Sequence, residues 1–187
     1  MLPSILVNLA TAVCVVAAAL IHVKKAPLWV MLRYFTVLSN LLCAVASLAV
    51  AICRLGGELP YWAAVLKYVG TSAVTLTLMT VVCFLGPTIG YKVLFSGPDL
   101  WLHLFCPALA IVSFLLWDKA DMPFAMVFLG TAPVPAYGIL YIYRVLLAPE
   151  ERRWKDFYGF NRNGRWWLSC AAMLLAAFAV SLVLWLI

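Results

Sequence analysis

Six stretches of the chain contain no lysine, arginine, aspartate or glutamate, and this pattern limits the fold more than any other feature. The stretches are residues 1–23, 34–53, 68–91, 100–117, 122–143 and 166–187. A helix needs about 20 apolar residues to cross the hydrocarbon core of a bilayer, so each stretch is long enough to span it. Inside the bilayer a backbone must satisfy its own hydrogen bonds, which makes helices the expected structure.

The composition indicates the same class of protein. Of the 187 residues 67% are hydrophobic and 11% are charged, whereas soluble domains carry roughly 25% charged residues. We therefore expect an all-α polytopic membrane protein, a bundle of six transmembrane helices in one domain, residues 1–187. The expected helices cover about residues 2–23, 33–53, 64–86, 100–117, 123–146 and 166–187.

The basic residues predict how the bundle is oriented. Ten of the 13 lie on or after the ends of the first, third and fifth helices, and three lie on the opposite side. Because cytoplasmic loops carry an excess of basic residues, we expect the odd-numbered loops in the cytoplasm and both termini outside. The net charge of +6 favours anionic lipid headgroups as its partner and not nucleic acid. The ten are Lys24, Lys25, Arg33, Lys92, Arg144, Arg152, Arg153, Lys155, Arg162 and Arg165, and the three are Arg54, Lys67 and Lys119.

The six cysteines are scattered singly through the apolar stretches. They form no C-x-x-C pair and no Cys/His cluster, so the pattern is typical of small buried hydrophobic residues. We expect no metal and no cofactor. The cysteines are Cys14, Cys43, Cys53, Cys83, Cys106 and Cys170.

A polar stripe opens the second expected helix, where the sequence reads YFTVLSN (residues 34–40). Arg33, Thr36 and Asn40 are spaced i, i+3, i+7, so they lie on one helix face, and Ser39 lies near that face. The stripe indicates either hydrogen bonding between helices, with Arg33 reaching to the interface, or the beginning of a site.

His103 is the only histidine placed well inside an expected span. Ionisable residues in the membrane are costly, which makes His103 a candidate for function as well as for a packing hydrogen bond. His22 stands at a helix end beside Lys24 and Lys25, and we expect it to face headgroups.

Thr36 and His103 are expected at similar depth. The second and fourth helices enter the membrane from the same side; Thr36 follows Arg33 by three residues and His103 follows Asp99 by four. If these helices touch, the hydroxyl and the imidazole can meet. A threonine hydroxyl becomes a nucleophile when an adjacent base accepts its proton, and histidine suits that task at neutral pH. The pair therefore predicts an acyl-threonine intermediate that water hydrolyses.

Other polar residues are candidates for supporting roles at such a site. Oxyanion-binding or site-shaping groups could come from Asn40, Ser39 or a hydroxyl of the third helix such as Thr75. Asp99, one turn before His103, could orient the imidazole. A carboxylate on a fatty acyl substrate could be held by basic residues, which are Arg33, Lys24 and Lys25.

Two stretches resemble a known family. RYFTVLSNLL (33–42) and LHLFCPALAIVSFLLWD (102–118) are similar to the androgen-induced gene 1 and androgen-dependent tissue-factor-pathway-inhibitor-regulating protein family, which has six helices and bacterial relatives. The resemblance implies a threonine-dependent intramembrane hydrolase of fatty acid esters of hydroxy fatty acids, with Thr36 and His103 as catalytic residues. It also implies a lipid or fatty acyl ester as substrate and a bacterial cytoplasmic membrane as location.

Three other functions stay open. Hydroxyls of the third helix and the Pro133/Pro135 break could line the path of a small transporter or channel, although no internal repeat and no buried carboxylate is expected. His22 and His103 could serve a haem or quinone. The chain could also be a non-catalytic membrane scaffold.

Overall fold

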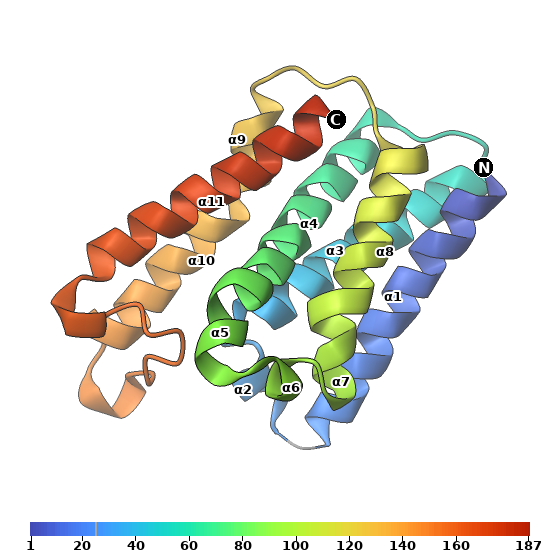
Figure 1. Ribbon diagram of the computed structural model, residues 1–187. Helices are drawn as coiled ribbons and strands as arrows, with labels where there is room; N and C mark the ends of the chain where they lie inside the picture. Colours follow the sequence, from blue (N-terminus) through green and yellow to red (C-terminus); the bar gives the residue numbers. More distant parts are fainter. Residues whose placement is uncertain (25) are drawn as a thin grey trace.

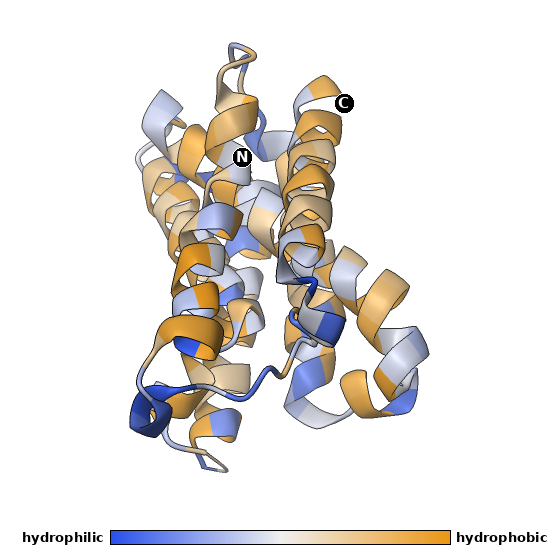
Figure 2. Cartoon of the chain, turned by 90° about the vertical axis from the view of Figure 1, so that its left-hand side faces the viewer, coloured by the Kyte–Doolittle hydropathy of each residue, from blue (hydrophilic) through white to orange (hydrophobic). Residues whose placement is uncertain are grey.

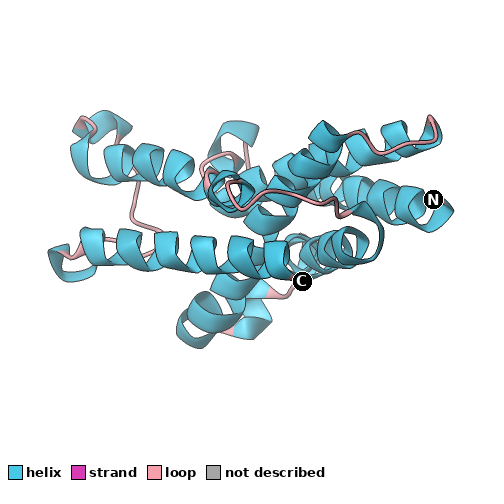
Figure 3. Ribbon diagram, turned by 90° about the horizontal axis from the view of Figure 1, so that it is seen from above, coloured by secondary structure: helices cyan, strands magenta, loops and turns pink. Residues whose placement is uncertain are grey.

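The computed structural model describes residues 1–24 and 26–187, with only the backbone of residue 162. Over this part of the chain six helical segments are long and apolar enough to cross a membrane, and Figure 3 shows helices joined by loops throughout. The prediction of an all-α six-helix membrane protein is confirmed. The segments are Leu2–Val23, Phe35–Leu55, Tyr61–Ile89, Gly97–Asp118, Met126–Leu147 and Trp166–Leu186.

Three of the spans are continuous helices and three are built from shorter pieces. Helices α1 (Leu2–Val23), α3 (Phe35–Leu55) and α11 (Trp166–Leu186) are continuous. The third span joins α4 (Tyr61–Thr80), the π-helical turn η1 (Val81–Leu85) and α5 (Gly86–Ile89). The fourth joins α7 (Gly97–Leu100), η2 (Trp101–Phe105), α8 (Cys106–Ser113) and η3 (Phe114–Asp118). The fifth joins α9 (Met126–Thr131), α10 (Pro133–Ile142) and η4 (Tyr143–Leu147).

The loops divide between the two ends of the bundle. Both termini lie at one end, and the connections that follow the first, third and fifth spans lie at the other (Figure 1). Short helices α2 (Leu28–Met31) and α6 (Tyr91–Leu94) stand in two of these connections, and η5 (Glu150–Arg152) and η6 (Arg162–Gly164) in the third. Figure 2 shows hydrophobic residues along the helices and strongly hydrophilic ones gathered in the loops. Which end faces the cytoplasm remains a prediction.

Small residues let α3 and α4 pack closely in the centre. A Cβ atom at Gly70 would lie 3.0 Å from Cα of Cys43, a distance that leaves no room for a larger residue. Close contact of this kind is how helices associate in lipid, where no hydrophobic drive brings them together. Gly70 therefore serves packing within the chain.

Proline changes the hydrogen bonding of the fourth span beside His103. Pro107 has no N–H and cannot bond to the carbonyl of His103. The helix widens to the π-helical turn η2 immediately before this position, at Trp101–Phe105. π-helical turns are frequent at functional sites. His103 therefore sits in locally altered backbone, as its spacing from Pro107 predicts.

Helix α9 is pinned against α4 and α11, and the chain beyond it diverges. A Cβ at Gly130 would lie 2.7 Å from Oγ of Ser181 in α11 and 2.7 Å from Cε1 of Tyr68 in α4. The Tyr68 hydroxyl also donates to the Ser181 carbonyl at 2.7 Å. Pro133 then starts α10, which lies with α11 beside the other spans (Figure 1). The close contact at one end and the divergence at the other leave space between α4 and the last two spans.

Candidate functional site

A cavity of about 590 Å³ occupies this space. Ligand pockets for small molecules typically measure roughly 300–1,000 Å³ and are mostly apolar. Its walls come from α4, η1, α10, α11 and residues 158–160, with one end reaching the first turn of α3. Ile139 and Phe84 line it and are 72% and 53% exposed. Because both belong to membrane spans, the cavity opens sideways toward lipid.

Thr36 stands on the cavity wall in the first turn of α3. Tyr34, which precedes this helix, provides no side-chain cap. The first backbone N–H groups of a helix have no partner within the helix. The Phe35 N–H instead donates to the Tyr158 hydroxyl at 2.9 Å. A phenol from the last long loop therefore caps the helix that carries Thr36.

Tyr158 also contacts Thr36 itself. Burial raises the pKa of the Tyr158 hydroxyl to about 12, while hydrogen bonds with the Phe35 backbone, with Tyr137 and with Thr36 act in the opposite direction. A phenol with this pKa keeps its proton at neutral pH and remains a hydrogen-bond donor. Tyr158 is the cavity residue that sequence reasoning missed, because it lies 123 positions from Phe35 in a loop without a recognisable motif.

The loop that carries Tyr158 is fixed by polar contacts of its own. The Tyr141 hydroxyl donates to Asp156 at 2.8 Å, and the same carboxylate accepts the N–H groups of Phe160 at 2.9 Å and Asn161 at 2.8 Å. The Tyr137 hydroxyl donates to the Arg33 carbonyl at 2.6 Å. Tyr137 and Tyr141 both line the cavity. The Tyr141 bond therefore holds the loop at the polar end of the cavity, and the Tyr137 bond holds α10 to the segment before α3.

His103 is not among the described residues that line the cavity. Its side chain is 7% exposed, and Nδ1 lies 2.7 Å from the Leu94 carbonyl oxygen. A carbonyl accepts only, so Nδ1 carries the proton and Nε2 of the neutral ring has a free lone pair. The described contacts include no hydrogen bond between His103 and Thr36. The predicted dyad is thus not joined in this structure.

Asn40 nevertheless ties the two backbones together at one depth. Its Nδ2 donates to the Thr36 carbonyl at 2.8 Å and to the Leu102 carbonyl at 3.0 Å. Since Leu102 precedes His103, the second and fourth spans touch here, which was a condition for the predicted pair. The side-chain oxygen of Asn40 is buried and has no hydrogen-bond partner among the described residues.

The residues predicted to bind an oxyanion point into helix packing. Ser39 Oγ lies 3.1 Å from the Thr36 carbonyl and 2.9 Å from the Thr77 hydroxyl, and Thr75 donates to the Thr71 carbonyl at 2.7 Å. Neither Ser39, Asn40 nor Thr75 lines the cavity. These side chains do not reach the cavity because hydroxyls and amides in membrane helices bond to carbonyls of the preceding turn. Tyr158, by contrast, lines the cavity together with Thr36.

The predicted partner of His103 belongs to another histidine. Asp99 Oδ1 lies 3.0 Å from Nε2 of His22, whose Nδ1 lies 3.1 Å from the Ala18 carbonyl. Asp99 therefore orients His22, and the Leu94 carbonyl orients His103. The expectation that His22 simply faces headgroups was wrong, and both its ring nitrogens are occupied by protein atoms.

The predicted carboxylate clamp is absent from the cavity wall as far as the structure describes it. The Arg33 guanidinium lies 4.3 Å from the Trp29 ring centroid and 5.6 Å from that of Trp154. Arg33 itself does not line the cavity. Lys24 does not line it either, and Lys25, the third candidate for this role, lies outside the described residues.

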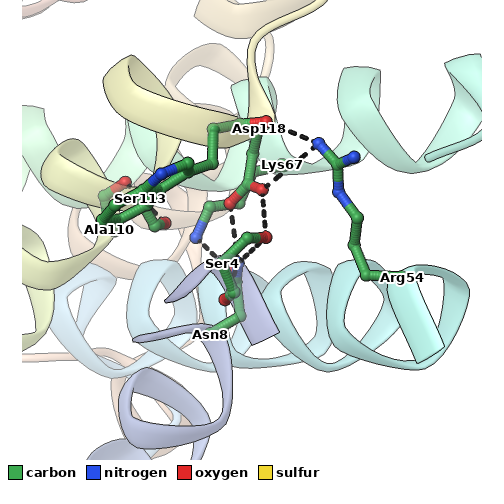
Figure 4. A network of polar contacts seen from close by, with 8 residues as sticks. Ser4, Asn8, Arg54, Lys67, Ala110, Ser113 and Asp118 are labelled. Atoms are coloured by element: carbon green, nitrogen blue, oxygen red, sulfur yellow. Dashed lines mark hydrogen bonds and ion pairs between the residues drawn. The ribbon is translucent and has the colours of Figure 1, made fainter. Parts of the chain in front are cut away.

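A second polar site lies at the opposite end of the bundle and was not predicted. Lys67 and Asp118 are both fully buried. Lys67 Nζ donates to Asn8 Oδ1 at 2.7 Å and to Ser47 at 2.9 Å. Asn8 Nδ2 and the Ser4 hydroxyl each donate to Asp118 at 2.6 Å (Figure 4). One amide thus bridges the two opposite charges.

Arg54 adds a third charge at the edge of this network. Its guanidinium lies 4.0 Å from Asp118 Oδ1 and donates to the Trp117 carbonyl. Neither Lys67 nor Asp118 lines the cavity beside Thr36 or a second cavity, which lies beside Lys119 and Trp185. The sequence-based expectation of no buried carboxylate was wrong, because Asp118 follows a charge-free stretch directly and resembled an interfacial residue.

Polar residues in the first span could have revealed the network. Ser4, Asn8 and Thr11 are spaced i, i+4, i+7 in an otherwise apolar stretch, so they share a helix face. All three are fully buried. A polar face in a membrane helix indicates polar partners on neighbouring helices. Lys67 and Asp118 are the partners of Ser4 and Asn8, whereas Thr11 donates to the Val7 carbonyl of its own helix.

The apolar helices suggest an integral multi-pass membrane protein. Over the described part of the chain, no group of three or more His, Cys, Asp or Glu side chains is placed to hold a metal ion. In comparisons with known proteins, no family model, no curated protein and no solved structure matches this chain.

Proposed function

We propose that this protein is an intramembrane esterase that cleaves fatty acyl esters with Thr36 as nucleophile and His103 as general base. The observation that carries the proposal is the position of Thr36 on the wall of the apolar cavity, at its polar end. An acyl chain would lie among the apolar walls, and its ester group would lie beside the Thr36 hydroxyl.

The reaction has two steps. The Thr36 oxygen attacks the ester carbonyl carbon while its proton passes to Nε2 of His103, and the alcohol then leaves with that proton. Water hydrolyses the acyl-threonine ester to a fatty acid and restores the hydroxyl. Tyr158 keeps its proton at neutral pH, so its hydroxyl is our candidate donor to the developing oxyanion.

The contacts of His103 support its role as base. With Nδ1 bonded to the Leu94 carbonyl, the ring is held in the tautomer that leaves Nε2 able to accept a proton. Asn40 holds the neighbouring backbone of Leu102 against that of Thr36. The proposal requires Nε2 to reach the hydroxyl, directly or through one water, when ester is bound; such bonds are often long without substrate.

Labelling with a fluorophosphonate probe tests the proposal. We expect the purified wild-type protein to be labelled, Thr36→Ala to lose labelling, and His103→Ala to be labelled at least about 100-fold more slowly, the usual contribution of a general base. Thr75→Ala is the matched control, because Thr75 bonds within its own helix and does not line the cavity. Labelling that is absent in wild type, or that persists in Thr36→Ala, would contradict the proposal, provided that all variants show the wild-type melting curve in detergent.

A second candidate function is a small transporter, and buried Asp118 is the observation that favours it. Intramembrane carboxylates often belong to ion pathways. Here, however, Ser4 and Asn8 occupy the carboxylate, and neither described cavity reaches it. Proton or solute flux into proteoliposomes that Asp118→Asn abolishes, with Asp121→Asn unchanged, would favour transport over hydrolysis.

A further inference from the structure

The chemical character of the cavity wall restricts the ligand. Of the 27 described residues on that wall, none is lysine, arginine, histidine, aspartate or glutamate. The polar groups that reach it are hydroxyls, thiols and backbone atoms. The hydroxyl-bearing residues are Thr36, Thr77, Thr80, Tyr137, Tyr141, Tyr158 and Ser169.

Several of these hydroxyls already have protein partners. Ser169 donates to the Phe160 carbonyl at 2.9 Å, and Tyr137 and Tyr141 donate to Arg33 and Asp156. Apart from the contact between Thr36 and Tyr158, the side chains of Thr36 and Thr80 make no hydrogen bond among those that the structure shows. The cavity can therefore offer a ligand a few neutral hydrogen bonds at one end.

The charged side chains near the polar end are directed elsewhere. The Arg33 and Arg144 guanidinium groups lie over the ring of Trp154, each 5.6 Å from its centroid. Asp156 lies behind the wall, bonded to Tyr141. A carboxylate placed in the cavity would face this negative charge through the phenol. Moving the carboxylate from water into the cavity would also remove its hydration. Because no cation on the wall replaces that hydration, the transfer costs several kcal/mol.

We infer that the cavity receives an uncharged acyl ester, such as a monoacylglycerol or an ester of a fatty alcohol, and excludes lipids that end in a free carboxylate. The inference rests on the proposed function in taking the cavity as the substrate site. It departs from the substrate that the sequence resemblance implies, because a fatty acid ester of a hydroxy fatty acid carries a carboxylate. An uncharged ester needs only the apolar walls and the few neutral hydroxyls.

The experiment compares two ligands that differ in one charge. The palmitoyl ester of hydroxystearic acid and the methyl ester of the same compound are offered to the wild-type protein in nanodiscs at neutral pH, and released palmitate is measured. We expect kcat/KM to be at least about tenfold higher for the methyl ester, a ratio that corresponds to about 1.4 kcal/mol. Monopalmitoylglycerol should behave like the methyl ester. Equal rates, or a preference for the acid, would overturn the inference.

A binding measurement separates this inference from the proposed function. The non-hydrolysable ether analogues of both compounds are titrated into Thr36→Ala protein, and quenching of intrinsic fluorescence gives the two affinities. If the uncharged ether binds more tightly but wild-type protein hydrolyses no ester, the proposed esterase function is wrong and the inferred ligand class stands. Tighter binding of the acid would overturn the ligand class even if hydrolysis is observed.

A cation placed on the wall provides the converse test. Thr80→Lys should reduce the preference for the methyl ester at least about tenfold, since the new ammonium compensates the ligand carboxylate. Thr80→Met is the matched control, because it fills similar space without charge, and it should keep the wild-type preference. The same change in both variants would contradict the argument from charge.

Discussion

Four spans of this protein are joined by buried charges at one end, whereas the last two spans lie beside them across an apolar cavity. The second and third spans bury 50% and 56% of the residues in their most apolar windows, and the fifth and sixth bury 17% each. In the network around Lys67 and Asp118 both charges have hydrogen-bond partners. At the cavity, by contrast, an uncharged wall is left open. We interpret the charged network as the structural scaffold and the cavity as the candidate functional site.

The largest expected effect comes from breaking the buried network. Replacing Lys67 by Met, or Asp118 by Asn or by Leu, removes one charge of the buried network, which costs roughly 3–5 kcal/mol. Combining Lys67→Met with Asp118→Leu should cost much less than the sum of the single changes. Unfolding of purified protein in mixed micelles measures this free energy, and exposed Asp121→Asn serves as control. Additive costs would mean that Lys67 and Asp118 do not act as a unit.

A smaller effect is expected at the two glycines of the fifth span. Gly130→Ala forces a Cβ to within 2.7 Å of Ser181 and Tyr68, and overpacking of this kind costs roughly 1–3 kcal/mol. Gly138, on the cavity wall, has open space where a Cβ would stand. Gly138→Ala should therefore leave the melting temperature unchanged or raise it slightly. If both changes destabilise the protein equally, the contrast between a pinned and an open region is wrong.

The smallest effect is expected at the contact between His22 and Asp99 near the membrane edge. The side chains of His22 and Asp99 are 21% and 43% exposed, so water screens their interaction. Asp99→Asn should lower the free energy of unfolding by less than about 1 kcal/mol. The same unfolding assay measures it, with Asp118→Asn as the buried counterpart. A cost as large as that of Asp118→Asn would show that burial does not distinguish the two carboxylates.

The spans could be predicted from the sequence because hydrocarbon excludes charge over a fixed thickness. The gaps between charged residues placed each helix to within a few positions, even where proline and π-helical turns interrupt it. The same rule failed at Lys67 and Asp118. Both stand directly beside charge-free stretches, and position along the chain does not distinguish a residue at the interface from one turned inward.

The candidate site could be predicted only in part. Thr36, which lines the cavity, was selected because its polar neighbours share a helix face. His103, selected because charge is rare at that depth, does not line it. Tyr158 and the pairing of Asp99 with His22 depend on how distant segments meet. Local spacing carries no information about such contacts.

The hydroxyl of Tyr158 caps a helix that the ribosome has made 123 residues earlier. The first amide of nascent α3 therefore has no cap until nearly the whole polypeptide has been synthesised. The last span, which supplies one wall of the cavity, arrives later still. Products truncated before Tyr158 would thus lack both the cap on α3 and the wall of the cavity that the last span provides.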